Sequence, residues 1–287
     1  MLRKLTFTFV ILAGLVIASG VRAEAPFADH VPADALVYIG WEGVEENWRT
    51  YSESRFAAGP AMDPQANANA QEAQQFADEM LPVVWRRPTA FYFAGVAFPG
   101  DEAAIDQPVT RLGILIDPGP DSDTVRKWFS ETVDRIAGEF PHLNAHFIEK
   151  GETMALVLGR DANPTRLPAG DGVAALSAAA NFKNATSRVG GAGVGTVYLD
   201  VAGFLGLLEQ GMVYEDADDE QAALRAFREA SGIGAIKTVT WTARFRGKDW
   251  VTRNFIEAPA PRKGLARTLD SGSIEEKLLR LVPGPAE

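Results

Sequence analysis

The stretch VPADALVYIGW, residues 31–41, predicts the strand around which the rest of the chain is organised. A Pro/Asp turn opens it, and seven uncharged residues follow, from Ala35 to Trp41. Because apolar side chains then fall on both faces, we expect an interior strand that is covered on both sides. Within it, Tyr38 and Trp41 are predicted to be core residues and not parts of a binding site.

A second copy of this strand begins near Val197, where Tyr198 aligns with Tyr38 and Gly203 with Gly43. Each copy continues into a helical region, a strong strand and a returning strand, so the order β-α-α-β-β occurs twice. Few residues are identical, and chance similarity is the alternative. The paired strands are predicted at Thr89–Phe98 with Arg111–Ile116, and at Ile236–Phe245 with Trp250–Glu257.

An amphipathic helix at 121–138, a hairpin at 145–159 and an Ala-rich helix at 173–188 lie between the two copies. Because tight β-β connections are antiparallel, we expect an α+β fold. It would have a mostly antiparallel, curved sheet with helices packed on one face. The alternation of Ile236–Phe245 predicts that its threonines face solvent.

The first 23 residues predict a secretory signal peptide. A short basic start precedes an apolar run, and a small-x-small site ends at Ala23, with cleavage before Glu24. An uncleaved anchor is the alternative, but the apolar run is shorter than the ~20 residues of a spanning helix. We therefore expect the protein to be exported to the periplasm or the extracellular space.

The 287 residues, of which 46% are hydrophobic, predict one large domain or two intimately joined ones. After the signal peptide at 1–23, the first unit with its added helix and hairpin would occupy 24–165. The second unit would occupy 166–260. Residues 261–287 would form a linker and a short helix, and the alternative is that they are the truncated start of a further unit.

The formal net charge of −10 makes nucleic acid and anionic membrane surfaces improbable partners, because an acidic surface repels both. No second apolar run is long enough to span a membrane. The chain contains no cysteine, so it has neither a disulfide framework nor a thiol nucleophile. No cofactor is predicted.

The sequence contains several polar clusters, and none of them is predicted to be catalytic, cofactor-binding or metal-binding. His142 and His146 have helical spacing but no third ligand or zincin glutamate. The glycine-rich run 190–195 follows a helix and opens a strand, the reverse of a phosphate loop. We interpret the acidic run 215–220 as the first turn of a helix, and calcium binding is the alternative. The same two interpretations apply to three further acids, Asp117, Asp121 and Asp123.

Some of these segments resemble a known family. The signal peptide followed by VPADALVY, the stretch LSAAANF at 176–182 and VYLD at 197–200 are similar to exported bacterial proteins of unknown function, common in planctomycetes. The resemblance covers most of the chain after residue 23. It implies no catalytic residue, because the family has no agreed active site.

Three functions follow as hypotheses. The first is a non-catalytic binding or scaffolding module of the cell envelope, whose partner is an apolar small molecule or an envelope protein. The second is an exported hydrolase that acts through acidic residues. The third is an assembly subunit that displays an exposed strand edge.

Overall fold

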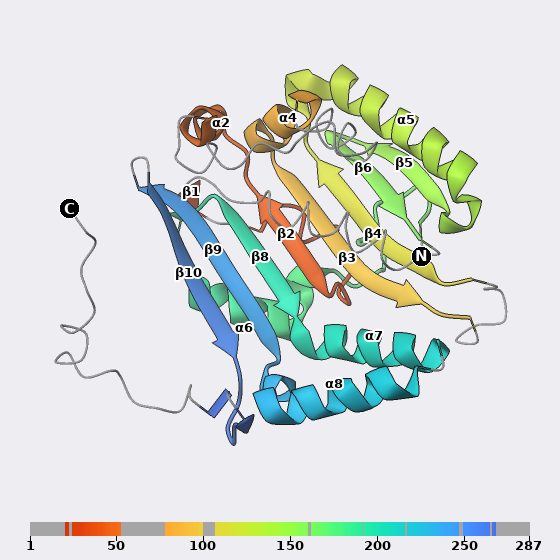
Figure 1. Ribbon diagram of the computed structural model, residues 1–287. Coiled ribbons are helices and arrows are strands. Elements are labelled where there is room, and N and C mark those ends of the chain that lie inside the picture. The colour runs from red at the N-terminus through yellow and green to blue at the C-terminus, as the bar shows by residue number, and fades with distance from the viewer. Residues whose placement is uncertain are drawn as a thin grey trace.

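The computed structural model describes residues 21–22, 25–52, 78–99, 107–159, 162–190, 192–215, 217–246, 249–264 and 266–267. A two-residue pair joins β1 (Val21–Arg22) to β7 (Ala192–Gly193). The other described strands are β2 (Val37–Trp41), β3 (Thr89–Ala97), β4 (Val109–Ile116), β5 (Ala145–Lys150), β6 (Thr153–Leu158), β8 (Gly195–Asp200), β9 (Thr238–Arg246) and β10 (Asp249–Glu257). They form one antiparallel sheet in the order β10-β9-β8-β2-β3-β4-β6-β5 (Figure 1).

Along the chain, the described helices alternate with groups of these strands, and the fold is α+β, as predicted. They are α2 (Glu45–Ser52), α4 (Leu81–Arg86), α5 (Ser122–Glu139), α6 (Ala180–Val189), α7 (Val201–Tyr214) and α8 (Asp218–Ser231). Single 3-10 turns lie at Gly119–Asp121, Pro141–Leu143, Leu176–Ala178 and Ile233–Ala235. Local sequence sets several helix ends. The Asp200 carboxylate caps α7 by accepting from the Gly203 N–H at 2.9 Å, and Gly232 ends α8 in a left-handed conformation.

The sheet has an approximate two-fold arrangement about its middle. β2 and β8, the strands that open the two predicted copies, pair with each other. Outward from them, β3 and β4 follow on one side, and β9 and β10 follow on the other. The helices α2 and α4 precede β3, as α7 and α8 precede β9. The two copies thus build one continuous sheet, and the extra hairpin β5–β6 extends only the first.

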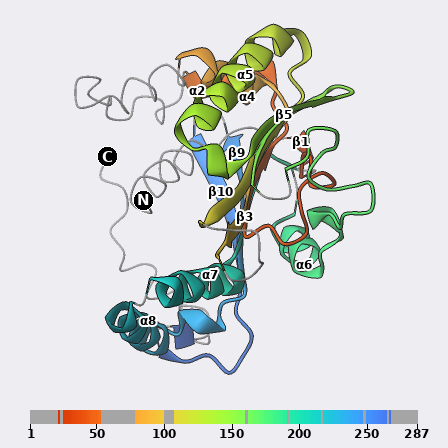
Figure 2. The ribbon, with the colours of Figure 1, turned by 90° about the vertical axis from the view of Figure 1, so that its right-hand side faces the viewer.

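Helices cover the two faces of the sheet unequally (Figure 2). One face, called the α5 face, carries α5 over β5 and β6 and α7 over β3, β8 and β9. α4 and α2 lie on the same side in Figure 2, with α2 packed on α4 and α8 packed on α7. The opposite face, called the α6 face, carries α6 over β8, β9 and β10. Helices therefore gather mainly on one face, as expected, with α6 as the exception.

The central strand β2 is buried from both sides, as its sequence predicts. Tyr38 is fully buried on the α6 face, where its ring packs edge-on against Phe182 of α6 at 5.4 Å between centroids. Ile39 points to the α5 face and packs with Phe91 and Phe93 of β3. Trp41 at the end of the strand donates its indole N–H to the Val84 carbonyl of α4.

The prediction of a solvent-facing side on β9 is wrong. Thr238, Thr240 and Thr242 are all buried, with 0%, 0% and 7% exposure. They lie on the α6 face, where α6 contacts β9. Threonine alternates with apolar residues in the sequence, as a solvent-facing residue would, but its methyl group and small volume also suit a surface on which a helix packs.

Other predicted boundaries shifted modestly. The helix predicted at 173–188 begins later, as α6 at Ala180. Residues 169–177 instead form backbone hydrogen bonds with residues 28–34, the leader segment that precedes β2. Parts of the predictions lie outside the described residues. These are the apolar run and cleavage site of the signal peptide, much of the helical region predicted after the first strand, and the short helix predicted within 261–287.

Candidate functional site

A cavity of about 420 Å³ lies on the α6 face, between the sheet and two loop segments. Small-molecule sites in proteins usually measure roughly 300–1,000 Å³, so the volume suits a small ligand. Its floor is formed by β3, β4 and β6, and its roof by the leader segment 32–34 and the loop 162–174. The lining residues are Pro32, Ala33, Asp34, Tyr92, Ala94, Arg111, Val157, Leu158, Ala162, Arg166, Pro168, Val173 and Ala174.

Backbone hydrogen bonds hold the roof together. The Ala33 N–H donates to the Ala174 carbonyl at 3.0 Å, and the Leu176 N–H donates to the Val31 carbonyl at 2.8 Å. A third bond runs from the Ala169 N–H to the His30 carbonyl at 3.0 Å. The leader and the loop are far apart in the sequence, and these bonds join them into one layer over the sheet.

Arg111 is the principal charged group of the cavity. Its guanidinium donates to both carboxylate oxygens of Asp34, from Nη1 at 2.8 Å and from Nη2 at 3.4 Å, and Nη1 also reaches the Ala94 carbonyl at 3.3 Å. The register between β3 and β4 shifts between Phe93 and Gly95, beside this residue. Such bulges commonly redirect a side chain, and here the irregularity lies where Arg111 enters the cavity.

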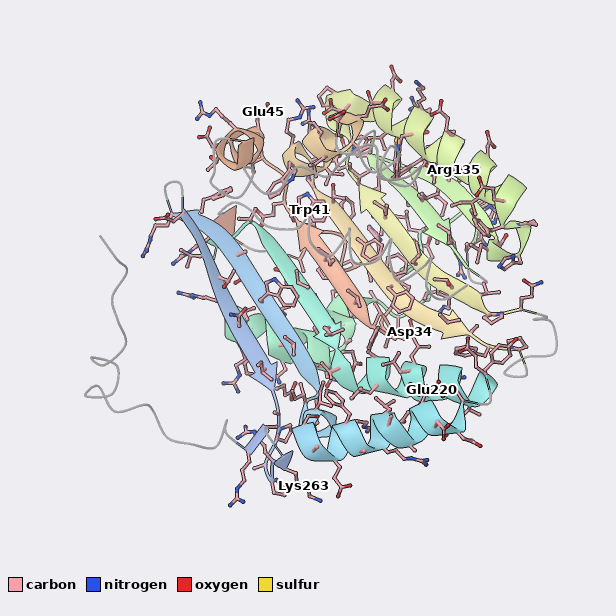
Figure 3. All side chains as sticks on the ribbon, viewed as in Figure 1. Asp34, Trp41, Glu45, Arg135, Glu220 and Lys263 are labelled. Carbon is pink, nitrogen blue, oxygen red and sulfur yellow. The ribbon has the colours of Figure 1, made fainter. Side chains whose placement is uncertain are left out.

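The Arg111 and Asp34 side chains differ in exposure, at 21% and 60%. The arginine is therefore held within the wall, while its carboxylate partner lies near solvent. Figure 3 places Asp34 at the end of β2 that lies nearer α7, and Trp41 at the opposite end of the strand. An exposed carboxylate of this kind can be displaced from an arginine at small energetic cost, about 0–1 kcal/mol.

The remaining lining is mainly apolar, with a second arginine. Tyr92, Ala94 and Val157 belong to the buried cluster that also contains Tyr38 and Phe182. Arg166 reaches the cavity from the loop. The pKa of the nearby Asp171 carboxylate is lowered by Lys150 and, to a smaller extent, by Arg166. The arrangement can enclose an apolar body and offer positive charge to one anionic group, since guanidinium groups match carboxylates and phosphates.

Two buried tyrosines lie under α6, beyond the cavity lining. Burial raises the pKa of Tyr38 well above its ordinary value, and it also raises the pKa of Tyr198, with the nearby carboxylates of Asp200 and Glu257 adding to the second effect. The Tyr38 hydroxyl donates to the Pro26 carbonyl at 2.7 Å. These hydroxyls stay protonated and serve packing.

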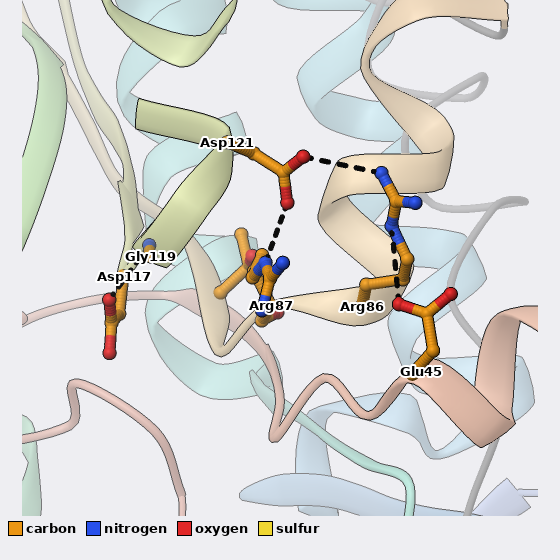
Figure 4. A network of polar contacts seen from close by, with 7 residues as sticks. Glu45, Arg86, Arg87, Asp117, Gly119 and Asp121 are labelled. Carbon is orange, nitrogen blue, oxygen red and sulfur yellow. Dashed lines mark hydrogen bonds and ion pairs between the residues drawn. The ribbon is translucent and has the colours of Figure 1, made fainter. Parts of the chain in front are cut away.

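The acids at 117–123 form structural contacts (Figure 4). Asp121 bridges Arg87 at 2.7 Å and Arg86 at 3.4 Å, and its side chain makes no capping bond to α5. Asp117 accepts from the Gly119 N–H at 3.2 Å, which closes a turn. Asp123 pairs with Arg126 at 2.7 Å on the helix surface. Each of these three carboxylates therefore has a local partner.

The histidines, the glycine-rich run and the acidic run lie on different elements of the fold. His142 lies in a 3-10 turn and His146 in β5. The glycine-rich run leads from α6 into β8, and Asp218, Asp219 and Glu220 form the acidic first turn of α8. Within the described ranges, no three His, Cys, Asp or Glu side chains gather as a metal ion would require.

Sequence reasoning missed Arg111 and Arg166 as lining residues. Arg111 carries a usable signal, because it is the one charged residue of its strand, between Thr110 and Leu112. Such a charge usually has a partner or a function. Arg166 has no such signal, since it lies in a Pro-rich loop where arginine is common.

In the part of the chain that the structure describes, no helix has the length and apolar character needed to cross a membrane.

Comparison with known proteins finds no match. No family model matches the chain, and neither a curated protein nor a solved structure matches it.

Proposed function

We propose that the chain is an exported, non-catalytic binding protein, and that its cavity holds a small ligand with an apolar body and one anionic group. The observation that carries this proposal is the cavity of about 420 Å³, which combines an apolar wall with Arg111 and Arg166. Ligand sites typically pair a mainly apolar lining with a few placed polar groups. Export rests on the predicted signal peptide.

The same lining favours binding over hydrolysis. A hydrolase that works through acidic residues needs two carboxylates that converge on its substrate. Among the described lining residues, Asp34 is the single carboxylate, and it is engaged by Arg111. A ligand anion could replace Asp34 on Arg111 and gain the second guanidinium of Arg166, which gives the binding a physical basis.

Calorimetry with three eight-carbon probes tests the binding. Octanoate, octanol and octylammonium share one apolar body and differ in the charge of the head group. We expect octanoate to bind most tightly and octylammonium least tightly. An Arg166→Gln variant should reduce the octanoate affinity to about that of octanol, whereas Arg188→Gln, at an exposed position of α6 outside the cavity, should leave it unchanged.

The possible results separate the parts of the proposal. If octanol binds as well as octanoate, the cavity takes apolar ligands and the anionic preference is wrong. If none of the three probes binds, and mass spectrometry of an organic extract of the purified protein finds no small molecule, the binding function is overturned. N-terminal sequencing of the protein from an expressing bacterium tests export, with Glu24 expected as the first residue.

A further inference from the structure

The apolar and the charged residues of the cavity lie at different depths. The buried lining residues are apolar or aromatic, and they form an inner wall made of Pro32, Tyr92, Ala94, Val157 and Leu158. The charged lining residues, Asp34, Arg111 and Arg166, all retain access to solvent. An anionic group of a ligand therefore finds its charged partners nearer to solvent than the inner wall.

The ion pair of Arg111 and Asp34 lies at the mouth of the cavity. Asp34 belongs to the lining although its side chain is 60% exposed, and Arg111 donates to it at 2.8 Å. A side chain that lines a cavity and also reaches solvent lies where the cavity opens. Ala174 is exposed as well and adjoins this mouth, because its carbonyl accepts from the Ala33 N–H.

Arg166 brings a second guanidinium to the solvent side of the roof. Lys150 and, to a smaller extent, Arg166 lower the pKa of Asp171, whose side chain is 66% exposed. The Arg166 charge therefore acts close to the protein surface, in the same loop as Ala174. Asp171 itself pairs with Lys150 at 2.7 Å, so these two residues together add no net charge to this part of the roof.

The charges of the described lining residues favour a ligand with a single negative charge. Arg111 and Arg166 contribute two positive charges and Asp34 contributes one negative charge, so the sum is +1. Asp34 is part of the chain and stays close to Arg111 even when a ligand displaces it. A second negative charge on the ligand would therefore face Asp34 without a further positive partner, and like charges repel.

We propose that the ligand is a phosphate diester of a single-chain alcohol, with its chain against the inner wall and its phosphate at the mouth, between Arg111 and Arg166. The ligand class rests on the proposed function, since it concerns the same cavity. A phosphate diester has one negative charge, as the lining requires. Its second ester group extends from the mouth into solvent and needs no room inside the cavity.

The two arginines also favour a phosphate over a carboxylate. Arg111 comes from β4 in the floor, whereas Arg166 comes from the loop in the roof. The oxygens of a phosphate are arranged tetrahedrally and can accept from donors on two sides. A carboxylate has the same charge, but its two oxygens lie in one plane, which suits a single guanidinium.

Four charged probes with eight-carbon chains test the class and the orientation by calorimetry. Glyceryl octyl phosphate, a diester, should bind about tenfold more tightly than octanoate, because its phosphate fits both guanidinium groups. Octyl phosphate, a monoester with a charge of about −1.5 to −2 at neutral pH, should bind less tightly than the diester. Octanedioate should bind roughly tenfold more weakly than octanoate, because its second carboxylate would lie against the inner wall.

Two variants locate the phosphate on the protein. Ala174→Glu adds a negative charge beside the mouth and should weaken diester binding about fivefold, while the affinity for uncharged octanol stays the same. Ala178→Glu is the matched control, because Ala178 is also exposed but lies outside the cavity lining. This control should change neither affinity.

The possible results distinguish the ligand class from the proposed function. If octanoate binds and the diester binds more weakly, or if the monoester binds most tightly, the diester class is overturned and the binding function stands. If octanedioate binds as tightly as octanoate, or if Ala174→Glu leaves the diester affinity unchanged, the orientation is overturned. If neither octanol nor any charged probe binds, the binding function fails, and the ligand class fails with it.

Discussion

Tyr38 lies directly opposite Tyr198 in the antiparallel pair of β2 and β8 at the middle of the sheet. These tyrosines are the equivalent residues of the two predicted copies, so the approximate two-fold axis passes between them. Both rings pack edge-on against Phe182 of α6, with centroids 5.4 and 5.2 Å away. One aromatic side chain on α6 therefore covers the centre of the repeat.

The burial of this tyrosine pair predicts a loss of stability at alkaline pH. The pKa of each hydroxyl is raised in the folded protein, so the unfolded chain ionises first, near pH 10. The stabilisation is fully present below that pH and is lost as the pH rises above it, by about 1.4 kcal/mol per pH unit for each tyrosine. Urea unfolding at a series of pH values measures the slope.

Phenylalanine variants assign that slope. Tyr198→Phe should reduce it by the share of one tyrosine. Tyr38→Phe should do the same and also cost about 1 kcal/mol at neutral pH, because the hydrogen bond to the Pro26 carbonyl is lost. Tyr214→Phe, at a side chain that is 44% exposed, is the control variant. An equal slope in all three variants would contradict the assignment.

Gly40 is predicted to be intolerant of a side chain, because the ring of Tyr38 lies over it. A Cβ atom at Gly40 would come within 1.9 Å of the Tyr38 hydroxyl oxygen. The ring is buried and held by Phe182, so Gly40→Ala should destabilise the fold by about 1–3 kcal/mol through overpacking.

Gly138 in α5 provides the matched control for this substitution. A Cβ atom there meets nothing within 4 Å. Gly138→Ala should therefore stabilise the helix, by about 0.5–1 kcal/mol. Denaturant unfolding measures both changes, and a Gly40→Ala variant as stable as the parent would show that the Tyr38 ring can move aside.

Asp121 is expected to matter more for stability than its neighbour Asp123. It serves two arginines whose side chains are about one quarter exposed, whereas the Asp123 side chain is 98% exposed. Asp121→Ala leaves both guanidinium groups without this carboxylate and should cost about 1–3 kcal/mol. Asp123→Ala should cost less than about 0.5 kcal/mol. Equal losses in thermal unfolding would contradict this reasoning.

Asp34 is predicted to compete with an anionic ligand for Arg111. Asp34→Asn removes that competition, so the octanoate affinity should rise, by up to about fivefold for an exposed ion pair worth about 1 kcal/mol. Stability should change little. Asp123→Asn is the control, because Asp123 pairs with Arg126 on the surface of α5, outside the cavity lining. A fall in affinity on Asp34→Asn would show that Asp34 positions Arg111 for the ligand.

The sequence by itself determined the elements and their repetition. Alternation in Thr89–Phe98 and the 3.6-residue period of 121–138 reflect which side chains face the core, and this pattern is local. The hairpins are also predictable from local sequence, because a short connection forces the two strands that it joins to pair antiparallel. The pairing of Tyr38 with Tyr198 was not predicted, although their equivalence was.

Only the tertiary structure decided where the cavity lies and which face α6 covers. The cavity requires the leader at 32–34, the loop at 162–174 and three strands to meet, and no local pattern encodes such distant contacts. The threonines of β9 show the same limit, because alternation gives the two faces of a strand but not what packs on each. That choice depends on the chain's long-range path, which is set by the packing of the whole core.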